Sequence, residues 1–170
     1  MFHYKTIFHI LGLLLLFNGG AMLIASLVSL FLDDGATSGL FLSTGITFGV
    51  GLSMMLLTRK EKREIKKRDG YLIVVLGWLV MVVFGTLPFL TTDSIDSLTD
   101  AFFETMSGYT ATGATVIQDI EALPKSLILW RSLTHWLGGM GIIVLAIAIL
   151  PLLGIGGVQL FSAEAPGVGG

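Results

Sequence analysis

The segment 110–115, with the sequence TATGAT, offers chemistry through its backbone rather than its side chains. Its β-branched residues and its glycine make it poor helix material, so the segment favours extended backbone. A line of peptide carbonyl oxygens that faces one axis can replace the hydration shell of a cation, which is how a selectivity filter works. Gly113 can adopt backbone angles that other residues resist, and its carbonyl can turn toward the axis beside those of Ala111 and Thr112.

The stretch before this segment predicts a short helix that would aim it. Residues 99–108 include a mainly apolar stretch at 101–106, with Thr99 or Asp100 able to accept from the first free N–H groups and Gly108 able to end the helix. About ten residues extend roughly 15 Å, which is half of a bilayer. We therefore expect a re-entrant pore helix that enters the membrane, returns, and points the negative end of its dipole at a cation.

Three ionisable side chains accompany this segment. Glu104 lies in an apolar stretch, where an ionised carboxylate costs about 2.5–3.5 kcal/mol at full membrane depth. We interpret Glu104 as a support of the pore helix through hydrogen bonds or charge pairing, with direct attraction of cations as the alternative. Arg131 is its candidate partner, unless that side chain extends to the lipid headgroups. His135, one turn later, is interpreted as a hydrogen-bonded buried imidazole rather than a proton relay.

The composition requires a membrane for most of the chain. Of its 170 residues 54% are hydrophobic and 13% are charged, against about 25% charged in soluble domains, and the mean hydropathy is +0.87. There is no cysteine, which excludes disulfides and thiolate metal sites. The net charge of −2 gives no attraction to nucleic acid, and the hydrophobicity excludes a disordered chain.

Four apolar runs are long enough to span, and they predict an all-α integral membrane protein with four transmembrane helices, one re-entrant pore helix and a filter loop. The runs cover residues 7–32, 39–57, 71–90 and 126–153. A cleaved signal peptide ending near Gly19 is the alternative for the first run. In the second run, Gly45 and Gly49 have the spacing that lets helices approach closely, so we expect them to pack against a neighbour.

A basic segment, residues 59–68, contains most of the ten lysines and arginines of the chain. By the positive-inside rule this loop and the N-terminus are cytoplasmic, with binding to lipid headgroups as an alternative role for the loop. The connections on the opposite side are acidic, which concentrates cations and repels anions. Their acidic residues are Asp33, Asp34, Asp93, Asp96, Asp100, Asp119 and Glu121.

Three motifs together resemble one family. They are DAFFE at 100–104, SGYTATGAT at 107–115, and WRS followed by HWLGGMG within 130–141. In this order they are similar to the first pore repeat of the Trk/Ktr/HKT superfamily of potassium-uptake proteins. The resemblance covers Tyr71 to about Glu164, and the two preceding runs resemble the extra N-terminal helix pair of the TrkH branch.

The resemblance implies roles for individual residues and for partners. Gly113 would be the filter glycine, and the filter segment that binds potassium through its backbone would be Thr110, Ala111, Thr112, Gly113 and Ala114, with the ion at Ala111, Thr112 and Gly113. Potassium would be the substrate, without a cofactor. A bacterial inner membrane, a homodimer and a cytosolic nucleotide-binding regulator of the TrkA type are also implied.

The sequence departs from the family pattern in its number of repeats. Family members resemble four repeats fused around one axis, whereas this sequence contains one, so either it is the N-terminal part of a longer protein, which we favour, or identical copies assemble. We expect an N-terminal helix pair at 1–58, a basic cytoplasmic loop at 59–70, the pore repeat at 71–160 and the start of a cytoplasmic linker at 161–170.

Two other classes of function are alternatives to potassium uptake. A structural or assembly subunit of another membrane complex would keep the apolar runs but would not need small residues at 110–114. An intramembrane enzyme would use Asp100, Glu104 or His135. The sequence offers no HExxH motif, no paired intramembrane aspartates and no serine–lysine dyad, so we predict no enzymatic activity.

Overall fold

The computed structural model describes residues 4–59 and 66–149, and within them it is all helical. The elements are α1 (Tyr4–Leu32), α2 (Thr37–Leu57), α3 (Lys67–Gly85), α4 (Leu87–Thr91), α5 (Leu98–Tyr109), the 3₁₀ turn η1 (Ile120–Ala122) and α6 (Lys125–Ile149). Four helices are long and apolar enough to cross a membrane: α1, α2, α3 together with α4, and α6. The prediction of an all-α membrane protein is confirmed.

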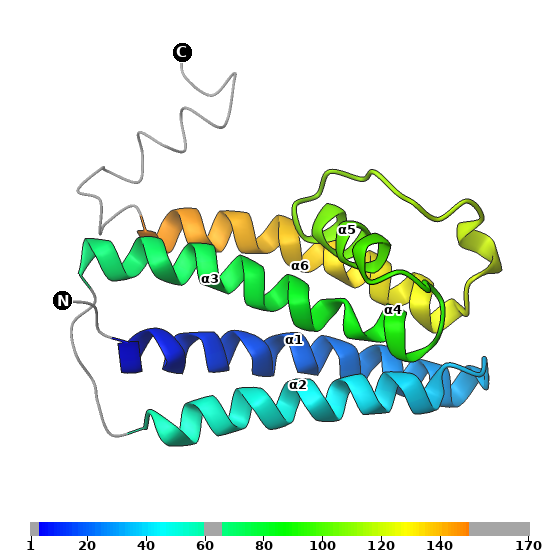
Figure 1. The fold of residues 1–170 in the computed structure, drawn as a ribbon, viewed down its shortest axis with the longest axis horizontal. Coiled ribbons are helices and arrows are strands. Elements are labelled where there is room, and N and C mark those ends of the chain that lie inside the picture. The colour runs from blue at the N-terminus through cyan, green and yellow to red at the C-terminus, as the bar shows by residue number, and fades with distance from the viewer. Residues whose placement is uncertain (1–3, 60–65, 150–170) are drawn as a thin grey trace, which may run out of the picture.

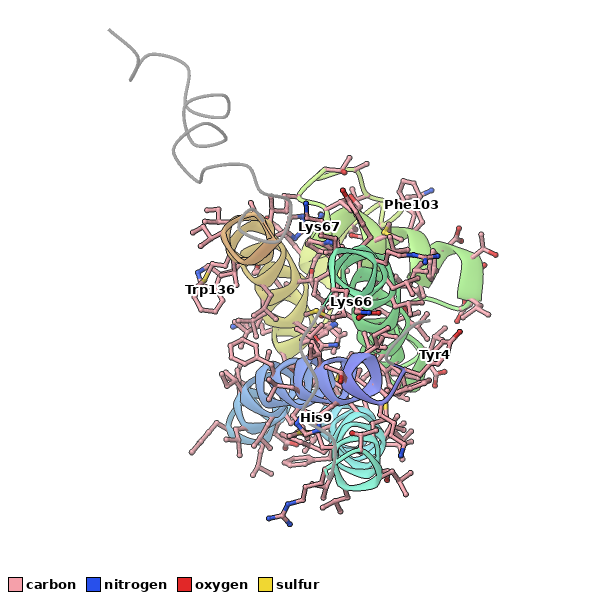
Figure 2. The ribbon with its side chains drawn as sticks, turned by 90° about the vertical axis from the view of Figure 1, so that its left-hand side faces the viewer. Tyr4, His9, Lys66, Lys67, Phe103 and Trp136 are labelled. Atoms are coloured by element: carbon pink, nitrogen blue, oxygen red, sulfur yellow. The ribbon has the colours of Figure 1, made fainter. Side chains whose placement is uncertain are left out.

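The four long helices lie lengthwise beside one another, and α5 lies at one end of this bundle (Figure 1). Viewed along the helices, α1 lies between α2 on one side and α3 and α6 on the other (Figure 2). The connection from α1 to α2 is at the same end as α5, and Lys66 and Lys67 are at the opposite end. α1 is therefore the member of the N-terminal pair that lies between α2 and the two helices α3 and α6.

Glycines bring α1 and α2 together, but they are not the ones predicted. A methyl group on Gly12 would lie 2.8 Å from the carbonyl oxygen of Gly51, so the two backbones touch. The same test at Gly45 and Gly49 finds nothing within 4 Å. The predicted packing of that pair is wrong within the described chain, because the buried face of α2 follows Leu40, Ser43, Thr44, Thr47 and Gly51. A helix that is apolar all round gives no periodicity from which that face could be predicted.

The third apolar run is divided into two helices. α3 ends at Gly85, and α4 begins with Leu87 and has Pro88 in its first turn. Proline lacks the N–H that the helix would use, and its ring clashes with the carbonyl of the residue four positions earlier. The Thr86 hydroxyl donates to the carbonyl oxygen of Val82 at 2.7 Å and closes the end of α3.

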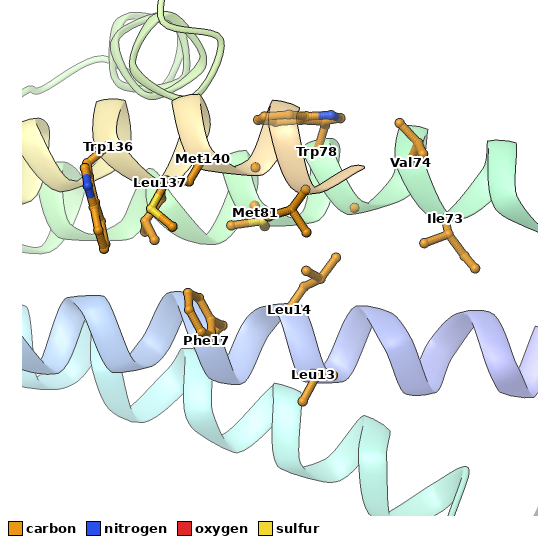
Figure 3. Close-up of a pocket in the computed structure, with 13 residues that line it drawn as sticks. Leu13, Leu14, Phe17, Ile73, Val74, Trp78, Met81, Trp136, Leu137 and Met140 are labelled. Carbon is orange, nitrogen blue, oxygen red and sulfur yellow. The ribbon is translucent and has the colours of Figure 1, made fainter. Parts of the chain in front are cut away.

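An apolar cavity of about 290 Å³ lies between α1, α3 and α6. Figure 3 shows Leu14 and Phe17 of α1 opposite Met81 of α3 and Leu137 of α6. Beside the cavity, the N-terminal helix pair and the later helices share two apolar clusters, one with Leu11 and Ile73 and the other with Met22 and Val82. Two polar contacts between the same parts of the chain are described below.

Candidate ion-binding site

The short helix α5, which the sequence predicts as a pore helix, begins one residue before the predicted range and ends one residue after it. Its N-cap is Ser97, whose backbone is extended and whose hydroxyl accepts from the backbone N–H of Asp100 at 3.4 Å. The prediction that Thr99 or Asp100 caps the helix is therefore wrong. A cap residue needs extended backbone while the next residues turn, and Ser97 meets that requirement.

The end of α5 turns directly into the filter segment. The N–H of Thr112 donates to the carbonyl of Ser107 and that of Ala111 to the carbonyl of Gly108, both at 3.0 Å. This pair of bonds is a Schellman cap, in which the residue after the C-cap takes the left-handed conformation. That residue is Ala111, with φ of 55°. Glycine usually occupies this position, because left-handed backbone costs other residues roughly 1–2 kcal/mol.

The filter segment exposes its backbone. Gly113 has φ of 81°, so the unusual backbone predicted for it is confirmed. Within the described chain, the carbonyl oxygens of residues 110–113 accept no hydrogen bond. The carbonyl of Ala114 differs, because it accepts from the Ser107 hydroxyl at 2.6 Å. Unengaged carbonyl oxygens are what a dehydrated cation requires, so the segment divides into an available part before Ala114 and a held part from Ala114 onward.

Glu104 holds the residues that follow the filter segment and ties them to α6. Its side chain is buried, with the residue 2% exposed. One carboxylate oxygen accepts from Nε of Arg131 at 2.7 Å, and the other accepts from the backbone N–H of Val116 at 3.0 Å. The Thr115 hydroxyl lies at 3.0 Å from one oxygen and 2.9 Å from the other. Of the alternatives weighed for these two residues, the structure shows charge pairing between Glu104 and Arg131.

The C-terminal end of α5 is enclosed by neighbouring helices at glycines. A methyl group on Gly138 of α6 would overlap the carbonyl of Tyr109, and one on Gly85 of α3 would lie 2.8 Å from the Tyr109 ring. The indole N–H of Trp130 donates to the carbonyl of Gly85 at 3.0 Å. Trp130 is therefore a core residue, whereas Trp136 is 59% exposed. These contacts leave Tyr109 little room to move.

α1 also reaches the end of α5. The hydroxyl of Tyr109 donates to Oδ1 of Asn18, and Nδ2 of Asn18 donates to the carbonyl of Met81 in α3 at 3.2 Å. Asn18 and Tyr109 are both fully buried. The sequence reasoning missed this contact, although an amide in a membrane-spanning run was the signal that could have indicated it.

A second link joins the N-terminal pair to α6 at the end of the bundle where α5 lies. One oxygen of Asp34 accepts from both the backbone N–H and the hydroxyl of Ser126, at 3.0 and 2.6 Å. The other accepts from the Ser29 hydroxyl at 2.5 Å and from the N–H of Ala36 at 3.1 Å. Partial burial alone would raise the pKa of Asp34, but these hydrogen bonds outweigh it and lower the pKa to about 2.

The remaining candidates from the sequence are His135, a possible metal site and the C-terminal linker. Nδ1 of His135 lies 2.8 Å from the carbonyl of Arg131, one turn earlier, so this ring nitrogen carries the proton. His135 is half-buried rather than buried. Within the described residues there is no group of histidine and acidic side chains that could hold a metal ion. The expected linker at 161–170 lies outside the described residues.

Comparison with known proteins places these features in a family. The model of the TrkH family, described as cation transport protein, matches residues 39–168. The Trk system potassium uptake protein TrkH of Escherichia coli K12 is 46% identical over 166 residues, which are 97% of this chain and 34% of that protein. An uncharacterized cation transporter of Methanocaldococcus jannaschii is 32% identical over 161 residues, 95% of this chain and 34% of that protein.

A solved structure agrees with the sequence relatives. The crystal structure of the potassium transporter TrkH from Vibrio parahaemolyticus matches with a TM-score of 0.84 and 47% identity, covering 91% of this chain and 33% of that one. The chain thus spans about one third of the length of the proteins it matches. Because the family model covers most of the sequence and the fold agrees, the chain belongs to the TrkH family of cation transport proteins.

Proposed function

We propose that this chain supplies one of four pore repeats to a potassium-uptake protein of the bacterial inner membrane. In the filter segment, the backbone of Thr110, Ala111, Thr112 and Gly113 would bind potassium, with the ion at Ala111, Thr112 and Gly113. Ala114, whose carbonyl accepts from Ser107, would end the segment. The observation that carries the proposal is the set of exposed carbonyl oxygens at 110–113 that accept no hydrogen bond in the described chain. Such oxygens at the end of a helix too short to span can replace water around a cation.

The surroundings of the segment support this use. α5 directs the negative end of its dipole toward the filter segment. The charge of Glu104 is neutralised by Arg131, and its oxygens also accept hydrogen bonds from Thr115 and Val116. Glu104 would therefore position the residues after the filter segment and would not attract the ion as a free charge. The concentration gradient and the membrane potential would drive the ion inward.

The remaining repeats would come from the same longer chain or from further copies. The relatives named as potassium uptake proteins are about three times the length of this chain, since it covers 34% of the Escherichia coli protein. One repeat cannot surround an axis, which agrees with the exposure of residues 110–116. The proposed assembly also includes a second copy of the transporter, as a homodimer, and a cytosolic nucleotide-binding regulator of the TrkA type. Co-purification of the transporter with that regulator tests the regulator's part in the assembly.

The proposed orientation follows from charge. Residues 59–70 and the N-terminus would be cytoplasmic, because lysine and arginine are retained on that side. The acidic connection at Asp33 and Asp34 is at the opposite end from Lys66 and Lys67, which is the end where α5 lies. The proposed units are therefore an N-terminal pair at 1–58, a cytoplasmic loop at 59–70, a pore repeat at 71–160 and a linker from 161, with the ion entering at the end that carries α5.

Replacement of Gly113 by serine in the assembled transporter tests the function. A side chain at this left-handed position costs roughly 1–2 kcal/mol, so we expect discrimination between potassium and sodium to fall about tenfold. Ion flux into vesicles and growth at limiting potassium measure the effect. The matched control is Gly35→Ser, since Gly35 has φ of 82° and open space around it but lies in the α1–α2 connection. Unchanged discrimination in Gly113→Ser would refute the assignment and favour a structural subunit.

A further inference from the structure

We propose that Asn18 of α1 is a positioning residue for the ion filter, acting through the hydroxyl of Tyr109. The inference rests on the proposed function and adds a role for the N-terminal helix pair, which contributes no residue to the filter segment. Tyr109 is the last residue of α5, and Thr110 directly after it opens the filter segment. A bond that fixes Tyr109 therefore fixes the start of the filter.

The directions of the hydrogen bonds at Asn18 are fully determined. The carbonyl of Met81 can only accept, so the Asn18 atom beside it at 3.2 Å must be the amide nitrogen. The amide oxygen then faces Tyr109, whose hydroxyl must donate. Asn18 thus spans from α3 to α5, and its amide has a partner on each side.

Burial leaves Asn18 and Tyr109 dependent on each other for this hydrogen bond. Asn18 and Tyr109 have no exposed surface, so neither polar group can turn to water if its partner is removed. Asn18 also lies in the middle of a 29-residue apolar helix, where an amide is costly unless it is bonded. The bond is the means by which α1 holds the end of the pore helix.

Different contacts hold the main chain, the ring and the hydroxyl of Tyr109. Gly138 packs on the Tyr109 carbonyl and Gly85 packs on its ring, so the main chain and the ring are held by close packing. The hydroxyl is held by its hydrogen bond to Asn18. Two residues later Ala111 has a left-handed conformation that surrounding structure must maintain. Loss of the bond would remove one constraint on the residue before the filter segment, so we expect small displacements of the carbonyls that follow.

A double-mutant cycle on the assembled transporter in lipid vesicles tests the proposal. The variants are Asn18→Leu, Tyr109→Phe and the two combined, and the measurement is the ratio of potassium to sodium flux. Each single change removes the same hydrogen bond, so we expect each to lower the ratio about fivefold. The combined variant should also show about fivefold, not the product, because the second change finds no bond to remove.

Thermal stability, measured on the same samples, separates positioning from folding. Each single variant leaves one member of the Asn18–Tyr109 pair without its partner, whereas the combined variant leaves neither. The combined variant still lacks the bond from Asn18 to the Met81 carbonyl, so its stability should return part of the way to that of the wild type while its flux ratio stays low. The control is Ser26→Ala, which removes a buried contact of 3.0 Å between α1 and Thr44 of α2, away from α5. It should lower stability and keep the wild-type flux ratio.

The outcomes distinguish this proposal from the proposed function. Selective potassium flux in the wild type together with a wild-type ratio in Tyr109→Phe and in the combined variant overturns the role of Asn18 alone. Flux ratios that follow thermal stability in all four variants overturn it as well. Failure of the wild type to discriminate potassium from sodium overturns the proposed function. Tyr109→Phe keeps the ring and its packing, so it keeps the test valid if Asn18→Leu does not fold.

Discussion

Two carboxylates, Glu104 and Asp34, hold the same end of α6, and they do so by different means. Glu104 is 2% exposed and bonds Arg131 at 2.7 Å. Asp34 is half-exposed, and its bonds in the described chain come from hydroxyl and backbone N–H groups, with Ser126 in the first turn of α6. One carboxylate has a full countercharge, and the other has the partial positive charge of a helix N-terminus.

The difference follows from how much water each carboxylate retains. A buried charge without a countercharge is strongly destabilising, which is why Glu104 comes with an arginine. A half-exposed carboxylate keeps part of its hydration and needs only hydrogen-bond donors, which a helix N-terminus supplies. Glu104 therefore holds the turn after the filter segment, and Asp34 holds the N-terminal pair against α6. The comparison predicts unequal costs for removing them.

The largest effect is expected for Glu104→Ala. The change leaves Arg131 without its countercharge and frees Thr115 and Val116, so the free energy of unfolding should fall by about 3–5 kcal/mol. Denaturant titration of the purified protein in detergent measures this loss. Adding Arg131→Met should recover part of it, because the uncompensated charge is gone. Equal stability of Glu104→Ala and the wild type would show that the buried pair contributes nothing.

A smaller effect is expected for Asp34→Asn. The amide keeps the shape but loses the charge that favours the N-terminus of α6, so the free energy of unfolding should fall by about 1 kcal/mol. Asp33→Asn is the matched control, since Asp33 is the exposed preceding residue and asparagine tolerates its φ of 48°. A loss of stability in the control equal to that in Asp34→Asn would contradict the capping role.

The smallest effect is a dependence on pH that belongs to Asp34. Its pKa is lowered from 3.8 to about 2 in the folded protein, so its contribution to stability is full above about pH 4 and is lost as the pH falls through 2. The unfolding midpoint of the wild type should therefore decline over this window and converge with that of Asp34→Asn. Parallel curves for the two proteins down to pH 2 would contradict the shifted pKa.

The parts of the molecule set by local sequence were predictable. Apolar runs long enough to span gave the four long helices, and the short stretch before a glycine gave α5 within one residue at each end. The unusual backbone of Gly113 followed from its residue type and position. A buried charge in a membrane helix requires a partner, which favoured pairing of Glu104 with Arg131. The alternative was that Arg131 extends to the lipid headgroups.

The parts set by contacts across the fold were not predictable. Asn18 meets Tyr109 from 91 positions away, and Asp34 meets Ser126 from 92. No spacing along the chain reports such distances, and helices that are apolar on every side do not reveal which face is buried. For the same reason the glycine spacing at 45–49 pointed to the wrong face of α2.

The pairing of Glu104 with Arg131 also has a consequence for the order in which α5 and α6 enter the membrane during synthesis. The two residues are 27 positions apart, so α5 leaves the ribosome well before its countercharge does. Until α6 enters the bilayer, the carboxylate has no countercharge and is stabilised by water, so α5 is expected to stay at the aqueous surface. Insertion of the pore loop is therefore expected to wait for α6, so any pause in translation between them would leave the loop outside the lipid.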